Sequence, residues 1–251
     1  MTAATTSMKS VQDHYDRMLG SVYSWIIGDF GVICRRNAAL LESLGLQSGS
    51  GALAVDLGCG PGCHSIPLAE AGFRVIAVDF CDELLTELQG RAANLPITTV
   101  RDNILHFRNY LDEHPQAVLC MGDTLVHLPD WDAVRTLLED VVDSLLPGGA
   151  FVASLRDYST SPPHGQEQFI PVRSNADRIF TCFLQYREDA VEVRDILQTR
   201  DGDDWKLEVS QYRKLRLDYR RVIGLLQDLG MHVDAAFEDH GMICIRSVKP
   251  G

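Results

Sequence analysis

The chain has 251 residues, of which 45% are hydrophobic, enough to bury one full core with an appended subdomain. Its formal net charge is −12 and no stretch is rich in Lys or Arg, which argues against nucleic acid and anionic membrane surfaces as main partners. Seven scattered cysteines are typical of reduced thiols in the cytoplasm, and no apolar run reaches the length of a membrane span.

The N-terminal part of the chain predicts helices. Apolar residues recur at helical spacing within 8–44, with a break near 28–31, so we expect two amphipathic helices there. The first of them carries Tyr15, Tyr23 and Trp25. Their rings form either a stripe that packs against another helix or the aromatic wall of a binding site.

A loop rich in glycine follows the first predicted strand. Residues 53–57 form a short apolar run that contains the acid Asp56, and glycines come next at alternate positions. These glycines are Gly58, Gly60 and Gly62. A chain that leaves a strand through such a loop and then enters a helix exposes backbone N–H groups to a ligand. In a dinucleotide fingerprint the third glycine would stand at Cys63, so the spacing here is different.

The next two predicted strands also lead into polar residues. The run 73–79 reads as a buried strand that ends in Asp79, and Phe80 follows it. An acid about twenty residues beyond a glycine loop commonly binds the hydroxyls of a ribose. The apolar run after it leads into Asp102 and Asn103, a pair that suits either a ligand or an ordinary turn.

The fourth predicted strand, 117–121, ends in Met121 and is followed by Gly122 and Asp123. Open α/β sheets bind ligands at the carboxyl ends of their strands, so these residues are candidates for a site. Asp123 alternatively caps a helix that begins at the next residue. His127 stands one turn later, where an imidazole suits a general base, although a histidine among apolar neighbours is more often a packed core residue.

The fifth predicted strand, 145–152, opens with a Leu-Pro-Gly-Gly turn, and the charged pair Arg156 and Asp157 that follows it is a candidate for a substrate site. Strand-like alternation returns further on, and we expect the antiparallel strands 178–186, 190–199 and 205–215. In the last of them, Tyr212, Arg213 and Lys214 are expected on the solvent face. A helix over 218–229 and a hairpin over 231–248 complete the chain.

The acid and alternate glycines of the first loop, with the strand-end Asp79 and the later Leu-Pro-Gly-Gly turn, resemble the class I S-adenosylmethionine-dependent methyltransferases of the small-molecule type. The resemblance implies an α/β fold with a seven-stranded, mostly parallel, doubly wound sheet ending in an antiparallel hairpin. It divides the chain into an N-terminal helical lid (1–45), a cofactor-binding core (46–156), an antiparallel β insertion on the substrate side (157–217) and a C-terminal helix and hairpin (218–251).

The resemblance also implies roles for single residues. S-adenosylmethionine would be bound by Asp56, Gly58, Gly60, Gly62, Asp79, Phe80, Asp102, Asn103, Met121 and Gly122, with Asp56 either accepting from the cofactor's ammonium or ordering the loop. A small-molecule acceptor would be bound by Tyr23, Trp25, Asp123, Arg156 and Asp157. His127 is the candidate proton acceptor, with Tyr15 as the second candidate catalytic residue. Residues 8–30 would form a mobile lid over the cofactor.

Three alternatives remain open. A nicotinamide-dependent oxidoreductase is disfavoured by the glycine spacing and by the lack of a Tyr-x-x-x-Lys pair on a helix. A protein that binds S-adenosylmethionine without transferring its methyl group is a second alternative. Either a hydroxyl or an amine acceptor is compatible with the sequence. We expect no metal, because Cys59 and Cys63 have no matching second pair.

Overall fold

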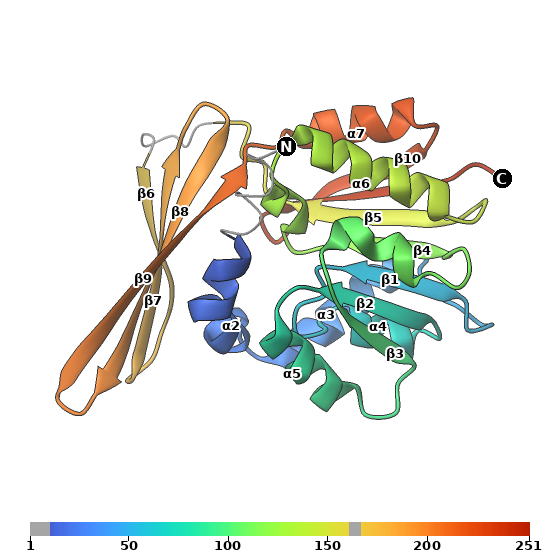
Figure 1. The fold of residues 1–251 in the computed structure, drawn as a ribbon. Coiled ribbons are helices and arrows are strands. Elements are labelled where there is room, and N and C mark those ends of the chain that lie inside the picture. The colour runs from blue at the N-terminus through green and yellow to red at the C-terminus, as the bar shows by residue number, and fades with distance from the viewer. Residues whose placement is uncertain (1–10, 161–166) are drawn as a thin grey trace.

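The computed structural model describes residues 11–160 and 167–251, which form two sheets and the helices around them (Figure 1). The larger sheet has seven strands in the order β10-β11-β5-β4-β1-β2-β3. All its neighbouring strands pair in parallel except β11, which is antiparallel to both β5 and β10. The strands are β1 Leu53–Leu57, β2 Arg74–Asp79, β3 Ile97–Arg101, β4 Ala117–Cys120, β5 Ala150–Leu155, β10 His232–Asp239 and β11 Met242–Val248. The expected fold class is thereby confirmed.

Helices cover both faces of this sheet because its central strands are apolar on both sides. Every residue of β1, β4 and β5 is buried. One face packs against α3 (Phe30–Ser43), α4 (Ser65–Glu70) and α5 (Asp82–Ala92). The other face packs against the 3₁₀ helix η2 (Ile104–Tyr110), α6 (Trp131–Ser144) and α7 (Tyr219–Asp228). Strands buried in this way need parallel neighbours joined by helical crossovers, which is the doubly wound arrangement.

The N-terminal helices break where the sequence predicts. Gly28 has a φ of +104°, and the Asp29 side chain accepts a hydrogen bond from the backbone N–H of Val32 at 2.8 Å, which caps α3. Before this break lie a helical turn at 11–14, the π-helical segment η1 (Tyr15–Leu19) and α2 (Gly20–Ile27). The first residues of the expected lid, 8–10, lie outside the described residues.

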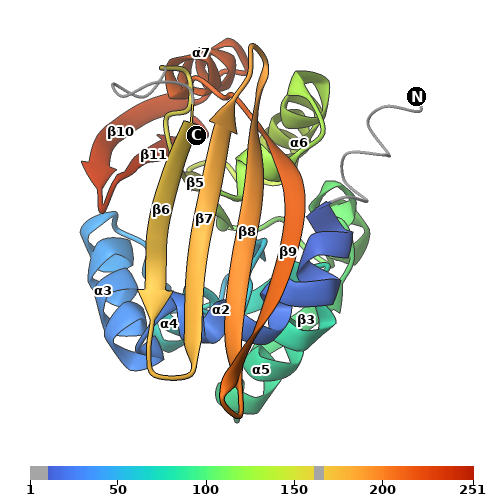
Figure 2. The same cartoon turned by 90° about the vertical axis from the view of Figure 1, so that its left-hand side faces the viewer.

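The second sheet is antiparallel and stands beside the core, with strand order β6-β7-β8-β9 (Figure 2). Its strands are β6 Glu167–Ser174, β7 Arg178–Tyr186, β8 Ala190–Asp201 and β9 Asp204–Leu215. The edge strand β6 is not among the strands expected from the sequence, because Pro171 interrupts its pattern. The register shifts just after Pro171, and edge strands tolerate proline there since its missing N–H faces no partner.

The N-terminal segment lies between this sheet and the core (Figure 1). Met18, Leu19 and Val22 are buried against Phe180 of β7 and Leu197 of β8. On the core side, the Ser24 hydroxyl donates to the Glu87 carboxylate of α5. The segment therefore contacts both halves of the molecule.

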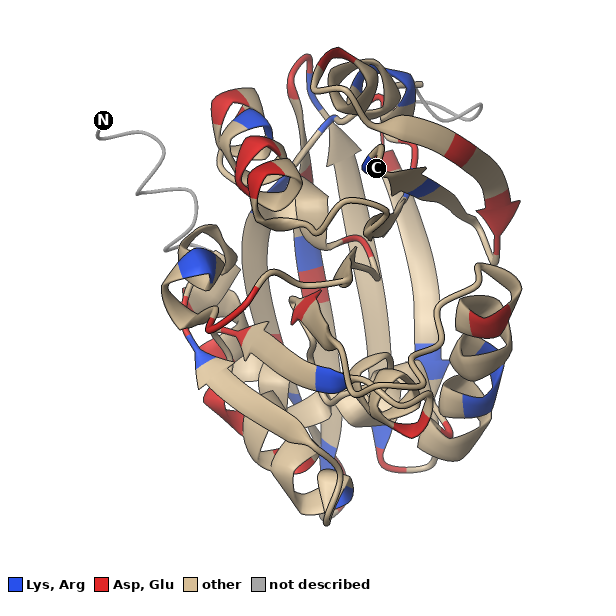
Figure 3. Cartoon of the chain, turned by 90° about the vertical axis from the view of Figure 1, so that its right-hand side faces the viewer, with Lys and Arg blue, Asp and Glu red and all other residues tan. Residues whose placement is uncertain are grey.

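Charges of both signs are interspersed over the elements of the core (Figure 3). The exposed pair of Arg74 with Glu113, 2.7 Å apart, is typical of this surface. Among the residues that the structure describes, no helix is both long and apolar enough to cross a membrane.

Candidate active site

A mostly apolar cleft opens at the carboxyl ends of β1, β2 and β4. These strand ends meet because the three strands are parallel neighbours in the sheet. The cleft is lined by Tyr15, Tyr23, Gly58, Cys59, Gly60, Pro61, Cys63, His64, Asp79, Phe80, Leu84, Ile104, Met121, Gly122, Thr124, His127 and Leu128. Six of the ten residues expected to bind the cofactor line it: Gly58, Gly60, Asp79, Phe80, Met121 and Gly122.

Asp79 ties the first two strand ends together. Its Oδ2 accepts a hydrogen bond from the backbone N–H of Gly60 at 2.8 Å, and its Oδ1 accepts from the N–H of Cys81 at 2.9 Å. Burial raises the pKa of Asp79, and the backbone donors oppose that rise. The carboxylate is thus fixed at the wall of the cleft, where each oxygen keeps a second lone pair for a ligand hydroxyl.

Two of the loop glycines are required by close packing. A Cβ on Gly58 would lie 2.5 Å from Cγ2 of Thr124, and a Cβ on Gly62 would lie 2.3 Å from Cδ1 of Leu88. Both residues also have positive φ, of +73° and +94°. Gly62 therefore serves to seat the loop on α5, and it does not line the cleft.

Asp56 lies beneath the loop instead of in the cleft. Its Oδ2 accepts a hydrogen bond of 2.6 Å from the hydroxyl of Ser65, the first residue of α4. Burial raises the pKa of Asp56 to about 7. Of the two roles expected for this acid, its contacts match the one in which it orders the loop.

Asp102 and Asn103 are also absent from the lining of the cleft. The Asp102 carboxylate accepts from the Tyr110 hydroxyl at 2.7 Å and lies 3.0 Å from Nδ1 of His106. The Asn103 side chain accepts from the N–H of Leu105 and caps η2. The structure shows the turn-forming role for this pair, next to Ile104, which does reach the cleft.

A second and larger cavity, of about 770 Å³, adjoins the cleft. Its walls come from the N-terminal segment, the ends of β4 and β5, the inner face of the β6–β9 sheet and the β10–β11 turn. Tyr15, Tyr23, Gly122 and His127 line both the cleft and this cavity. These four residues therefore mark the place where a molecule in one space meets a molecule in the other.

His127 stands at this junction on the 3₁₀ helix η3 (Thr124–His127). Burial and, to a smaller extent, the nearby Lys214 ammonium lower the pKa of His127 to about 3. Its Nδ1 is buried and has no hydrogen-bond partner among the described residues. The ring is therefore neutral at physiological pH and carries an unsatisfied polar atom beside the junction.

The tyrosines of the junction are neutral as well. Burial raises the pKa of Tyr23 to about 12 and that of Tyr15 well above its ordinary value. The Tyr15 and His127 rings meet edge to face, with centroids 6.3 Å apart. Because Tyr15 keeps its proton, it can donate a hydrogen bond or present its ring to a cation, but it is not a proton acceptor at neutral pH.

Trp25 does not reach either cavity, contrary to its expected role in acceptor binding. Its ring lies 5.8 Å from the guanidinium of Arg173 and 6.0 Å from that of Arg178. Helical geometry explains the difference, because Trp25 is two residues from Tyr23 and faces away from it.

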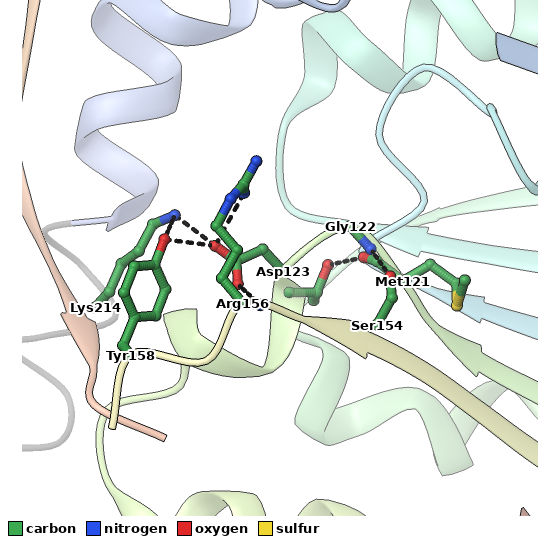
Figure 4. A network of polar contacts seen from close by, with 8 residues as sticks. Met121, Gly122, Asp123, Ser154, Arg156, Tyr158 and Lys214 are labelled. Carbon is green, nitrogen blue, oxygen red and sulfur yellow. Dashed lines mark hydrogen bonds and ion pairs between the residues drawn. The ribbon is translucent and has the colours of Figure 1, made fainter. Parts of the chain in front are cut away.

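A buried ion pair lies in the wall of the larger cavity and belongs to the polar network drawn in Figure 4. The Lys214 ammonium lies 2.7 Å from Oδ2 of Asp123 and 3.2 Å from the Tyr158 hydroxyl, which itself donates to Asp123 at 3.1 Å. Burial opposes the charge on Asp123, but the attraction of Lys214 outweighs it and holds the pKa of Asp123 below its ordinary value. Lys214 has a pKa well above its ordinary value despite its burial, because Asp123 stabilises its charge.

The turn after β4 aims Asp123 at this pair. Asp123 has a φ of +74°, a left-handed conformation that aspartate tolerates better than most residues. The Ser154 hydroxyl accepts from the N–H of Gly122 at 2.8 Å, and the Ser154 carbonyl accepts from the N–H of Asp123. The side chain of Asp123 makes no capping bond to η3, so the capping alternative is wrong.

Arg156 and Asp157 line the larger cavity, as expected of acceptor-binding residues. The backbone N–H of Arg156 donates to Oδ1 of Asp123. The guanidinium of Arg156 lies 3.6 Å from Oδ2 of the same carboxylate. Two cations, Arg156 and Lys214, therefore share the Asp123 carboxylate, and further carboxylates of the lining belong to Asp157, Asp195 and Glu238.

The surface position expected for Tyr212 and Lys214 is wrong, since both are buried, whereas Arg213 is exposed. Strand alternation misleads here because the apolar residues Trp205, Leu207 and Val209 of β9 point outward and are exposed. The buried face instead carries Ser210, Tyr212 and Lys214. A buried polar face of this kind indicates a site, not a core.

Comparisons with known proteins agree with this geometry. Residues 54–149 match a methyltransferase domain. The chain is 29% identical over 164 residues to glycine N-methyltransferase of Mus musculus, covering 60% of this chain and 56% of the relative. It is 28% identical over 115 residues to glycine/sarcosine N-methyltransferase of Halorhodospira halochloris, covering 45% and 43%. The chain thus spans about half the length of these curated relatives.

The fold is also found in solved structures. The CcbJ methyltransferase of Streptomyces caelestis superposes with a TM-score of 0.75 at 17% identity, over 95% of this chain and 98% of that one. A likeness at this identity shows the fold alone. Residues 54–149 of this chain thus match a methyltransferase domain, and the chain has the fold of solved methyltransferase structures.

Proposed function

We propose that this protein transfers a methyl group from S-adenosylmethionine to an amine nitrogen of a small molecule held in the 770 Å³ cavity. The observation that carries the proposal is the junction, where the same four residues line the cofactor cleft and the larger cavity. Direct transfer requires the acceptor atom to lie in line with the leaving sulfur, so the two sites must meet at one point. The cofactor supplies an electrophilic methyl on a sulfonium.

The residues of the cleft fit this cofactor. Asp79 offers carboxylate oxygens to ribose hydroxyls, and Gly60 presents a backbone without a Cβ at the floor of the cleft. Phe80, Leu84 and Ile104 supply apolar surface for a base. The Tyr15 and Tyr23 rings at the junction suit a positive sulfonium, because aromatic faces attract cations and exclude water.

An amine acceptor is supported by the state of His127. A neutral amine attacks a methyl sulfonium unaided, whereas a hydroxyl needs its proton removed as the new bond forms. A neutral His127 ring with a pKa of about 3 is a weak base, but it can accept a hydrogen bond from an amine N–H and orient the lone pair. Relatives named as glycine and glycine/sarcosine N-methyltransferases point to the same acceptor class.

The free hydrogen-bond donors of Arg156 and Lys214 support an acceptor that also carries an anionic group. Arg156 keeps donors free beyond its contact with Asp123, and about half of its side chain is exposed at the cavity wall. Lys214 has three donors, of which Asp123 and Tyr158 engage two. A carboxylate at this corner would place an amine several bonds away near the junction.

A hydroxyl acceptor is the second candidate, and the position of His127 favours it. The unpartnered Nδ1 is buried at the junction, where a proton acceptor would be needed. Bound substrates would exclude water from His127 and keep its pKa low. To accept a proton from a hydroxyl, His127 would need its pKa to rise during the reaction.

Two measurements test the proposal. Calorimetry should show binding of S-adenosylmethionine and of its product S-adenosylhomocysteine, and tight NADH binding without either would support the oxidoreductase alternative. S-adenosylhomocysteine release should then be followed with small amino acids and amines beside their hydroxyl analogues. We expect turnover with an amine and none with its matched alcohol; turnover with the alcohol alone would overturn the amine assignment. Cofactor binding without turnover on any acceptor would favour a non-catalytic binding protein.

A further inference from the structure

One buried histidine joins the N-terminal segment to the β6–β9 sheet. His14 Nε2 lies 3.0 Å from Oδ2 of Asp195 on β8, and Nδ1 lies 2.7 Å from the hydroxyl of Ser210 on β9. His14 is only 1% exposed and Asp195 only 3%. Both ring nitrogens are thus satisfied by two neighbouring strands, which fixes the position and rotation of the ring.

This histidine also contacts the aromatic residues behind the junction. Its ring stacks on that of Tyr212 with centroids 4.4 Å apart, and the Tyr212 ring lies 5.5 Å from that of His127. Asp195 and Tyr212 line the acceptor cavity, whereas His14 does not. His14 therefore lies behind the wall that an acceptor would touch, in contact with two residues of that wall.

The segment that carries His14 also forms part of the cofactor cleft. Tyr15, the next residue, and Tyr23, two turns on, line the cleft directly. Ser24 is bonded to Glu87 of α5, the helix that begins three residues after Asp79. If a bound cofactor orders this segment, the position of His14 becomes fixed as well. The contacts of His14 with Asp195 and Tyr212 would then fix these two residues of the acceptor wall.

We propose that His14 is a positioning residue that couples the two sites, so that cofactor binding sets the part of the acceptor wall formed by Asp195 and Tyr212. The inference rests on the proposed function in requiring that the cleft bind S-adenosylmethionine or its product. It goes further in assigning a coupling: a bound cofactor favours the geometry of the wall that the acceptor requires. By linkage, an acceptor would in turn tighten cofactor binding by the same factor.

Hydrogen exchange tests this coupling without knowledge of the acceptor, with S-adenosylhomocysteine as the probe. In the wild-type protein we expect the probe to slow exchange around Gly58 and Asp79, in 11–27, and at 193–197 and 208–214 of β8 and β9. In His14→Ala the slowing around Gly58 and Asp79 should persist. The slowing in β8 and β9 should fall by about 5-fold or more, the lower end of typical coupling between sites.

Matched variants separate coupling from stability. His232→Ala removes an exposed histidine and should behave as wild type. A purely structural role for His14 would speed exchange with and without the probe alike and leave their ratio unchanged, which would overturn the proposal. If His14→Ala does not fold, Ser210→Ala removes one of the two bonds, and wild-type slowing in β8 and β9 would contradict the coupling. Absence of probe binding in the wild type would overturn the proposed function, whereas binding with no change in β8 and β9 would overturn this inference alone.

Discussion

The cofactor cleft and the acceptor cavity are built in opposite ways. The cleft is assembled from loops that follow consecutive strands, and its main polar link, from Asp79 to Gly60, spans 19 residues of chain. The acceptor cavity depends on pairs far apart in sequence, with Asp123 and Lys214 separated by 91 residues and His14 and Asp195 by 181. The cleft is a property of the sheet, whereas the cavity exists only after the second sheet docks.

This difference has an energetic side. The Asp79 carboxylate of the cleft bonds to backbone N–H groups of its own loop and of the neighbouring loop after β1, so it is satisfied as soon as β1 and β2 pair. In the acceptor cavity, the buried charges of Asp123 and Lys214 lie on different elements, and loss of one leaves the other without its counter-charge. Variation of the acceptor wall should therefore disturb stability more than variation of the cleft.

The largest expected effect is on the Asp123–Lys214 pair. Asp123→Asn should lower the free energy of unfolding by about 3–5 kcal/mol, because it leaves the buried Lys214 ammonium without its counter-charge. Urea unfolding measures the change, with Asp189→Asn as the matched control, since Asp189 forms an exposed pair with Arg213 and should cost about 0–1 kcal/mol. Equal losses of unfolding free energy in the two variants would show that the buried pair stabilises the fold no more than an exposed pair does.

The same pair predicts a pH dependence. The folded pKa of Asp123 lies below its ordinary value of 3.8, so its contribution to stability is present above that pH. It should be lost as the pH falls from 3.8 toward the lower folded value. Acid unfolding of wild type and Asp123→Asn should therefore converge at low pH, and parallel curves would contradict the assignment.

In the cleft, the expected effect is on cofactor affinity. Asp79→Ala should weaken binding of S-adenosylhomocysteine by about 1.5–3 kcal/mol, which is the value of hydrogen bonds to a charged group. Asp79→Asn keeps an acceptor for one of the two backbone N–H groups and should fall between wild type and alanine. Calorimetry on the three proteins checks the order, and unchanged affinity in Asp79→Ala would remove this residue from the cofactor site.

The smallest effect is expected at the junction. If the acceptor is an amine, His127→Ala removes one hydrogen bond, and kcat should fall by about 2- to 13-fold. A hydroxyl acceptor would instead make the loss about 10²–10⁴-fold, as for a general base. With a pKa of about 3, His127 should contribute no titration to kcat between pH 5 and 9 in the amine case. Steady-state rates across this range distinguish the two.

The contrast between the two sites also explains what the sequence could reveal. The strand-end acids and alternate glycines predict the sheet and most of the cleft, because each signal lies within one loop. Asp79, Phe80 and Gly122, which follow from these signals, line the cleft. The loop-ordering position of Asp56 and the turn at Asp102 differ from the cofactor contacts that the resemblance implies, because short polar residues serve backbone and ligand equally well.

Local sequence patterns of this kind do not predict the residues of the acceptor wall. Nothing local to Lys214 indicates that it lies beside Asp123, and the outward apolar residues of β9 suggest the opposite face. His14 belongs to an amphipathic helix whose partner strands come some 180 residues later. Long-range pairs of this kind leave only one signal in a single sequence, which is a charged or polar residue repeated on one face of a strand.

A crystal structure with bound S-adenosylhomocysteine tests the central claim most directly. We expect the ribose hydroxyls to face Asp79 and the sulfur to lie at the junction between Tyr15, Gly122 and His127, open toward the 770 Å³ cavity. A sulfur atom at the opposite end of the cleft, near Cys63 and His64 and closed off from that cavity, would contradict it.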